Sequence, residues 1–315
     1  MIEKSLKLYN FIDPEVRLIR HNENMTYQVK SNKETYMMRV HKPVDGFSLG
    51  ILRDTKNAYQ YINGEIEILK YLSKNTNIGI QTPVANVAGE YITLIDDTPV
   101  TVLKWVEGET LDKITCTTDI GYQVGKMTAK LNRALSLVKR DKLVRYRYDK
   151  RLIKRMAEQV TDAEHQKQIL PSQMIYIQDA LLEIITRMEL INQNADNISL
   201  VHTDLSKSNM VFTGKSIIPI DFSLSGYCYY YMDIASLLSH FINIETQKEI
   251  IAGYESERLN KINLYYVEPF YAMQVLLFIT CQHNKCAKEE WFPKAVDRWC
   301  HTIFIPLTNK QNFLL

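Results

Sequence analysis

The first hundred residues alternate between apolar and polar positions with the two-residue period of half-buried β-strands. Runs of this kind occupy residues 15–21, 26–32, 34–42, 84–95 and 99–106. Ser31-Asn32-Lys33 and Asp96-Asp97 separate neighbouring runs and are typical of hairpin turns. Residues 58–74 change to helical spacing and predict one helix, which Gly64 weakens locally. A polar loop is expected over residues 43–57. The N-terminal part is therefore predicted to be a sheet with one helix.

From residue 107 onwards the pattern becomes helical. Helices are expected over 120–138, 139–170, 172–192, the MDIASLLSHFI segment and much of 245–300. Two short β-type runs, 210–212 and 216–220, are separated by Thr213-Gly214-Lys215 and predict an antiparallel hairpin. This order predicts an α+β, two-lobed fold: a strand-rich N-lobe over 1–103, a hinge at 104–108 and a helix-rich C-lobe over 109–315.

Composition narrows the class of protein. The 315 residues are 46% hydrophobic and 23% charged, with a net charge of +2, which argues against a dedicated nucleic-acid binder. The N-terminus lacks the apolar stretch of a signal peptide, and no apolar run approaches the roughly 20 residues that span a bilayer. The five cysteines are scattered and are most simply reduced thiols. We therefore expect a cytoplasmic protein that does not enter membranes.

Three polar residues flank the predicted hairpin. Asn209 immediately precedes its first strand and Asp221 immediately follows its second, so both lie at its open end. An amide oxygen and a carboxylate side by side are ligands suited to Mg²⁺. Asp204 lies five residues before Asn209 in a polar loop, where it could accept a proton from a substrate hydroxyl. Phosphoryl transfer from a magnesium nucleotide needs all three parts.

The segments HTDLSKSN (202–209) and IDFSLSG (220–226) follow the spacing of the kinase catalytic loop and metal-binding aspartate. On these segments the chain resembles the aminoglycoside phosphotransferase and choline kinase superfamily of small-molecule kinases. Within it, the chain is similar to the group with type II homoserine kinases and stress-response kinases. Further collinear likenesses lie in residues 23–43, 64–84, 103–111, 123–132 and 220–238. The resemblance covers about residues 15 to 255 and implies a protein-kinase-like fold.

The resemblance also implies roles for individual residues. Asp204 would be the catalytic base or would orient the acceptor hydroxyl, and His202 would brace the catalytic loop. Asn209 and Asp221 would hold Mg²⁺. The residues implied for ATP or GTP binding are Arg39 with its ion-pair partner Glu65, and Lys104, Trp105 and Val106, whose backbone would face the adenine. Asp233 would support the loop from behind. The implied activity moves the γ-phosphoryl group to a hydroxyl of an aminoglycoside, an amino alcohol or a similar metabolite.

The chain departs from kinase patterns at three places. The phosphate-contacting position is Arg39, where kinases commonly have a lysine. The related bacterial group also has an arginine at this position. HNENMTYQ (21–28) contains no glycine, so it is not the glycine-rich loop of protein kinases. The related group often carries aspartates after IDF, where this chain has Ser223 and Leu224. The last departure leaves the role of these two positions in metal or substrate binding open.

Other interpretations rest on charge and on cysteine or histidine clusters. Segment 139–155 carries nine basic and two acidic residues, which is compatible with a pseudokinase-like binding module and more simply with an amphipathic helix. A basic acceptor pocket there would disfavour a polycationic aminoglycoside. Acidic residues further on, Glu255, Glu257 and Glu268, would favour a cationic substrate, and the sequence leaves both open. Zinc is disfavoured at Cys281, His283, Cys286, Cys300 and His301.

Overall fold

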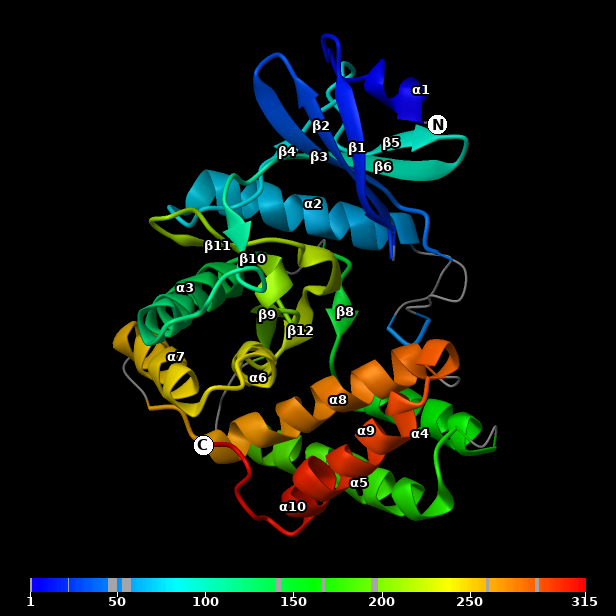
Figure 1. The fold of residues 1–315 in the computed structure, drawn as a ribbon, viewed down its shortest axis with the longest axis vertical. Helices are drawn as coiled ribbons and strands as arrows, with labels where there is room; N and C mark the ends of the chain where they lie inside the picture. The colour runs from blue at the N-terminus through cyan, green and yellow to red at the C-terminus, as the bar shows by residue number, and fades with distance from the viewer. Residues whose placement is uncertain are drawn as a thin grey trace.

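The computed structural model describes residues 2–21, 23–44, 50–52, 58–139, 143–165, 168–193, 198–258, 261–286 and 289–315. An N-terminal sheet lies above a larger helical part, and the chain crosses between them near residue 105 (Figure 1). This arrangement is the two-lobed α+β fold that the sequence pattern predicts. Most of the polar loop expected over 43–57 falls outside the described residues.

The N-terminal sheet is antiparallel, with the order β1-β2-β3-β6-β4 and β5 paired to β6. Its strands are β1 (Glu15–His21), β2 (Met25–Ser31), β3 (Glu34–Val40), β4 (Pro83–Val84), β5 (Thr93–Ile95) and β6 (Thr98–Lys104). Both predicted turns form two-residue hairpins with left-handed backbone, at Asn32-Lys33 and Asp96-Asp97. Helix α1 (Ile2–Leu6) lies beside β5, and helix α2 (Ala58–Asn75) lies beneath the sheet (Figure 1).

The prediction of one strand over 84–95 is wrong. The side chain of Asn86 accepts hydrogen bonds from the backbone N–H groups of Ala88 and Glu90, each at 2.9 Å. The Asn86 N–H also donates to the Glu90 carbonyl at 2.8 Å. A turn built on an asparagine side chain offers the backbone an alternative to strand pairing. The run is consequently divided into β4 and β5.

The helical part follows most of the predicted segments. It contains α3 (Thr118–Ser136), α4 (Lys150–His165), α5 (Pro171–Gln193), α6 (Tyr231–His240), α7 (Ile244–Ser256), α8 (Leu264–Cys286), α9 (Trp291–Trp299), a π-helical turn (Cys300–Phe304) and α10 (Ile305–Thr308). The predicted hairpin is present as β10 (Met210–Phe212) and β11 (Ile217–Pro219), and β7 (Glu109–Thr110) joins it.

A third sheet was not predicted. It has the order β8-β12-β9, with strands β8 (Tyr146–Arg147), β9 (Ser199–Val201) and β12 (Gly226–Cys228). Strands of two or three residues are too short to show a period, so the sequence pattern could not reveal them. The prediction that residues 139–170 are helical throughout is wrong at its start, where β8 precedes α4. Residues 140–142 lie outside the described part.

Helix α8 is long and apolar enough, by length and composition, to cross a membrane, and within the described ranges no other helix meets this test. Its apolar character was overlooked in the sequence pattern. Half of its most apolar window is buried inside the protein, as in a core helix. It also carries Glu268, fully buried and ion-paired with Arg187 of α5 at 2.8 Å. One helix with these properties is weak grounds for a membrane span.

A continuous apolar cluster connects the two lobes. It joins Ile66 and Leu69 of α2 to Leu131 of α3, and it includes Met210 and Phe222 on either side of the β10–β11 hairpin. Phe222 is completely buried, which fixes the backbone directly after Asp221. Close packing of this kind transmits small displacements instead of absorbing them. The sheet, α2 and the hairpin therefore position the polar residues between the lobes as one packed unit.

Candidate active site

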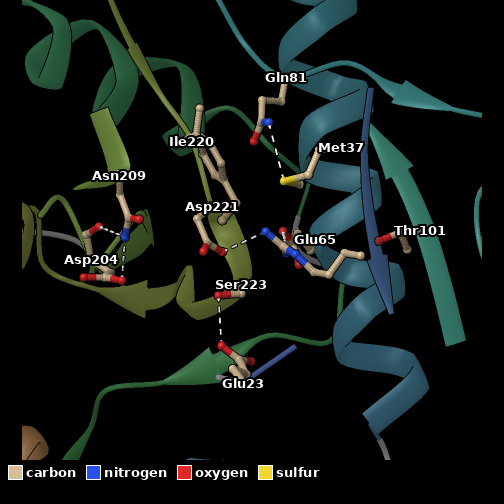
Figure 2. A network of polar contacts seen from close by, with 12 residues as sticks. Glu23, Met37, Glu65, Gln81, Thr101, Asp204, Asn209, Ile220, Asp221 and Ser223 are labelled. Carbon is tan, nitrogen blue, oxygen red and sulfur yellow. Dashed lines mark hydrogen bonds and ion pairs between the residues drawn. The ribbon is translucent and has the colours of Figure 1, made fainter. Parts of the chain in front are cut away.

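The open end of the hairpin brings Asn209 and Asp221 together, as predicted. The Ile220 N–H donates to the Asn209 carbonyl at 2.9 Å, directly beyond the Met210–Pro219 pair. Asn209 ends a short 3-10 turn and is buried. Asp221 has a left-handed backbone (φ 62°), an unusual conformation for a residue with a side chain. The carboxylate therefore leaves the strand direction and lies between the lobes (Figure 2).

Asp204 lies against Asn209, which was also predicted. The Asn209 amide Nδ2 donates to the carboxylate Oδ2 of Asp204 at 2.7 Å and to its backbone carbonyl at 3.0 Å. The amide oxygen of Asn209 is turned toward the side of Asp221 (Figure 2). Burial and the nearby Asp221 charge raise the pKa of Asp204 to about 6. The pKa of the Asp204 carboxylate is thus raised toward neutral pH.

Arg39 connects the sheet, the helix and the hairpin. Its guanidinium donates to Glu65 of α2 at 2.9 Å and to Asp221 at 3.1 Å. Arg39 is 3% exposed. Burial alone would lower its pKa, but the Asp221 and Glu65 carboxylates outweigh burial and raise it. The predicted pairing of Arg39 with Glu65 is present.

Arg20 of β1 was missed by the sequence analysis. Its Nη2 donates to the second carboxylate oxygen of Asp221 at 2.7 Å, and its side chain is 47% exposed. Burial would raise the pKa of Asp221, but Arg39 and Arg20 together lower it below its ordinary range. The two partners are far apart in sequence, and β1 is exposed along its length, so the pattern offers no signal for this contact.

His202 stabilises the loop through its neutral ring. Its Nε2–H donates to the Ile220 carbonyl at 3.1 Å, and its Nδ1 accepts from the Asp204 N–H at 3.4 Å. The ring also packs edge-on against the Phe222 ring, with 4.5 Å between the two ring centroids. Burial lowers the pKa of His202 to about 4, so the imidazole is uncharged at neutral pH. His202 therefore connects the loop that carries Asp204 with the strand end that leads into Asp221.

Asp233 supports the same loop from α6. Its carboxylate accepts from the N–H groups of Thr203 and His202 at 2.6 and 3.1 Å and from the Asn132 amide at 2.6 Å. Thr203 has a left-handed backbone (φ 70°), which is strained for a β-branched residue. The fully buried Asp233 therefore maintains the unusual turn that leads into Asp204.

Arg145 is the second residue that the sequence analysis missed, because it lies within the basic segment expected to be a solvated helix face. It is 5% exposed. Its guanidinium donates to the carbonyls of Phe222, Ser223 and Ser225 at 2.8, 2.6 and 2.7 Å. It also donates to the Tyr61 carbonyl of α2 at 2.6 Å. Arg145 thus ties the segment after Asp221 to the helix that carries Glu65.

The predicted adenine-facing residues lie where the chain leaves the sheet. The Lys104 N–H donates to the Thr82 carbonyl at 2.8 Å and the Trp105 N–H to the Thr35 carbonyl at 3.0 Å. Both N–H groups are therefore used within the protein. The backbone N–H of Val106 has no hydrogen bond in the described part of the chain. The nucleotide roles of all three residues stay predictions, as do the exact lobe boundaries.

A cavity of about 530 Å³ opens beside Asp204, Asn209 and Asp221. Glu23 and Ser223 lie at its rim, and the Ser223 hydroxyl donates to Glu23 at 3.4 Å. Its wall also contains the aromatic and amide side chains of Tyr148, Tyr271, Gln274, Phe278, Gln282 and Trp299. The basic side chains that the structure describes in segment 139–155 do not line this cavity and give it no basic character.

The three acidic residues considered for a cationic substrate lie elsewhere. Glu268 is buried against Arg187, and Glu255 pairs with Lys261 at 2.6 Å. Glu257 lies near Lys126 at 3.5 Å. None of them lines the cavity. The carboxylates available to an acceptor are consequently those at the catalytic end.

The donor set consists of hard oxygen ligands. Within the described residues no group of three or more His, Cys, Asp or Glu side chains is placed to hold a metal ion. Cys281 lines the cavity, while His283 contacts Gln159 and Gln168. Asn209 and Asp221 offer two oxygens. Such a pair suits Mg²⁺, which commonly takes one or two protein ligands and completes its shell with phosphates and water.

Comparison with known proteins identifies the class. The model of the APH phosphotransferase enzyme family matches residues 15–266. This match covers most of the chain, so the chain belongs to that family, and the predicted superfamily and enzyme class are confirmed. The finer likeness to homoserine and stress-response kinases stays a prediction.

Individual relatives are more distant. Amicoumacin kinase of Bacillus subtilis (strain 168) is 22% identical over 238 residues, which are 73% of this chain and 64% of that protein, so the match spans less than two thirds of the relative. A microcompartment-associated aminopropanol kinase has a TM-score of 0.77 at 19% identity, covering 100% of this chain and 98% of its own. Amicoumacin kinase hAmiN, in complex with AMP-PNP, Ca²⁺ and Ami, has a TM-score of 0.76 at 18% identity, covering 99% and 93%. These structures share the fold.

Proposed function

We propose that the protein transfers the γ-phosphoryl group of ATP, or of GTP, to a hydroxyl group of a small molecule, with Mg²⁺. The observation that carries this proposal is the convergence of Asp204, Asn209 and Asp221 at one cavity, beside the Arg39–Glu65 pair. Phosphoryl transfer depends on positioning and on charge stabilisation, and these residues supply both. A cytoplasmic location belongs to the same proposal, because the five cysteines are all free thiols.

In the proposed reaction the acceptor oxygen forms a bond to the γ-phosphorus while the bond from phosphorus to the bridging oxygen of the nucleoside diphosphate breaks. Asp204 orients the hydroxyl and receives its proton. Its raised pKa suits a group that takes up a proton near neutral pH. Mg²⁺ held by Asn209 and Asp221 would neutralise charge on the phosphates when bound. Arg39 lies where it can add its positive charge to that site.

Metal binding at Asp221 would compete with the two ion pairs that this carboxylate already makes. Arg39 and Arg20 occupy its two carboxylate oxygens. Arg39 is buried and is also bonded to Glu65, whereas the Arg20 side chain is half exposed. Displacing Arg20 from Asp221 consequently costs less free energy than displacing Arg39, because an exposed ion pair contributes little to stability. In this proposal Arg20 neutralises Asp221 before the magnesium nucleotide enters.

The cavity favours an acceptor with little positive charge. A polycationic aminoglycoside would need several carboxylates, since buried charges are costly without partners. Apart from Glu23 and the carboxylates assigned to catalysis and metal binding, the wall offers aromatic and amide side chains, among them Phe278, Gln282 and Trp299. We therefore favour a hydroxyl compound with an aromatic or apolar part and at most one cationic group near Glu23. An amino alcohol or an aromatic metabolite meets this description, and one protein of similar structure is named an aminopropanol kinase.

A screen of nucleoside diphosphate formation tests the proposal. It compares amino alcohols, aromatic hydroxy compounds and aminoglycosides as acceptors, with ATP and GTP as donors. Asp204→Asn is expected to lower kcat by about 10²- to 10⁴-fold with the best acceptor. Asp179→Asn, an exposed change on α5, is the matched control and is expected to leave kcat unchanged. Acceptor-dependent turnover that is indifferent to Asp204→Asn would refute the assigned role.

The binding-module alternative loses its main support. It requires the basic segment 139–155 to form one exposed surface, but Arg145 is buried and bonded to backbone carbonyls. Tyr148 of the same segment is buried in the wall of the large cavity. We therefore retain the enzyme as the proposed function, and the remaining arginines of the segment require a separate explanation.

A further inference from the structure

A second cavity, of about 480 Å³, lies between β8, the beginning of α4 and residues 50–52. Its wall contains four arginines, Arg145, Arg147, Arg151 and Arg155, and one acidic residue, Asp149. The lining therefore carries a formal excess of three positive charges. The cavity contains none of the residues proposed for phosphoryl transfer, and its ligand would be an anion.

Arg145, the buried member of this group, has no ion-pair partner among the described residues. All of the hydrogen bonds of the Arg145 guanidinium go to backbone carbonyls and to the Ser225 hydroxyl. No carboxylate lies within ion-pair distance of it in the part of the chain that the structure describes. Buried charges in proteins are normally paired, because an isolated one is costly. Among the described residues Arg145 therefore has no counter-ion, and a bound anion would supply one.

The other three arginines are exposed and retain donors. Arg155 uses its Nε for the Ile51 carbonyl at 2.8 Å, which leaves its terminal nitrogens. Arg147 lies over the Tyr227 ring at 5.1 Å, a contact that uses the face of the guanidinium and spares its edge. Within the described ranges the Arg151 side chain has no ion pair. Fork-shaped guanidinium groups are well suited to phosphate oxygens.

The negative charge of Asp149 offsets the positive charge of the cavity lining only in part. Its Oδ1 accepts from the backbone N–H groups of Arg151 and Leu152, at 2.9 and 3.3 Å, and so caps the beginning of α4. The N–H groups of the helix end are therefore already used, and an anion in the cavity would be held by guanidinium groups. An asparagine at this position would preserve the cap and remove the negative charge.

We propose that this arginine cavity is a binding site for a phosphate-type oxyanion, either free in solution or carried by a small molecule. Leu52 lines both cavities, so a ligand in the larger one could extend an anionic group into this one. Through Arg145 the bound anion would stabilise Phe222–Ser225, the segment that follows Asp221. The site thus adjoins the catalytic machinery without belonging to it.

Binding of inorganic pyrophosphate to the whole protein tests the site, measured by titration calorimetry without divalent metal. Arg151→Gln and Arg155→Gln are each expected to weaken binding about tenfold, and Asp149→Asn to tighten it severalfold. Lys154→Gln is the matched control, since Lys154 is an exposed cation on the same helix that does not line the cavity. Absent binding, or an equal loss with Lys154→Gln, overturns the proposal, as does binding that none of these changes alters.

A kinetic arm distinguishes the two sources of the anion and rests on the proposed function. Pyrophosphate that competes with the acceptor identifies an acceptor-borne anionic group. Pyrophosphate that changes kcat without competing identifies a free anion that acts on the Phe222–Ser225 segment. The calorimetric arm requires no turnover, so a failure of the proposed function leaves it intact. In that case Arg151→Gln would still weaken pyrophosphate binding in an inactive protein.

Discussion

Arg20 donates to Asp221 Oδ2 at 2.7 Å from a strand at the edge of the N-terminal sheet, so that a half-exposed cation neutralises the carboxylate proposed to bind metal. Asp221 is also held by the buried Arg39, at 3.1 Å. The two arginines contact different oxygens of one carboxylate. Removal of the exposed partner therefore leaves the Arg39 contact in place.

Arg20→Gln is expected to lower the Mg²⁺ concentration that gives half-maximal turnover, by up to about fivefold. The metal no longer competes with the Arg20 guanidinium, and an exposed ion pair of this kind is worth up to about 1 kcal/mol. A magnesium titration at saturating nucleotide measures the effect. Arg17→Gln, on the same exposed strand and without an ion pair in the described part of the chain, is the control. Weaker magnesium binding by Arg20→Gln would contradict this account.

Arg39→Lys is expected to raise the nucleotide KM about tenfold or more and to reduce stability by about 2–3 kcal/mol. The Arg39 fork reaches Glu65 and Asp221 at once, and a single ammonium group cannot reproduce both contacts. Urea unfolding and nucleotide kinetics give the two readouts. Glu65→Gln isolates one arm of the fork. An Arg39→Lys enzyme with unchanged KM and stability would show that the fork is unimportant.

His202 should contribute a loss of stability as the pH falls from about 6.5 to about 4, which is opposed by Asp204 and Asp233, whose pKa values are raised to about 6. The pKa of His202 is lowered to about 4 in the folded state, so the unfolded chain binds a proton in this window that the folded chain does not. The contribution is complete above about pH 6.5 and is worth about 3 kcal/mol. Unfolding free energies at pH 5 and 7 measure it. In His202→Gln this part of the slope should disappear, and an unchanged slope would contradict the assignment.

Gly64→Ala should destabilise the protein by about 2–4 kcal/mol, although alanine is normally the better helix former. A Cβ at position 64 would collide with the Val144 carbonyl oxygen and lie 2.8 Å from Arg145 Cδ. The substitution therefore pushes apart α2 and the segment that carries Arg145. Thermal unfolding decides the sign. A more stable Gly64→Ala protein would show that the close approach is not needed.

The sequence predicted the parts of the site that depend on local order. The hairpin, its open-end residues Asn209 and Asp221, and the loop position of Asp204 follow from alternation and turn chemistry within 20 residues. The Arg39–Glu65 pair came from the family resemblance, because a strand and a later helix carry no local signal of their contact. These predictions succeeded where short-range patterns or collinear motifs fix the geometry.

The residues that were missed join segments far apart in the chain. Arg20 reaches Asp221 across the lobes, and Arg145 reaches Phe222–Ser225 from a segment whose charge suggested solvent. A buried arginine bonded to carbonyls looks, in sequence, like any basic surface residue. The division of 84–95 at Asn86 had a local cause, but it depended on one side chain accepting two backbone hydrogen bonds. Tertiary contacts therefore supplied what the pattern could not.

Mass spectrometry of the acceptor after incubation with ATP and Mg²⁺ tests the central claim most directly. With the best acceptor from the screen, the wild-type protein should add one phosphoryl group to a hydroxyl. Asp221→Ala should reduce the rate by about 10³-fold or more, because the proposed metal site loses its carboxylate. Product formation by Asp221→Ala at the wild-type rate, or magnesium-independent transfer by the wild-type protein, would contradict the account.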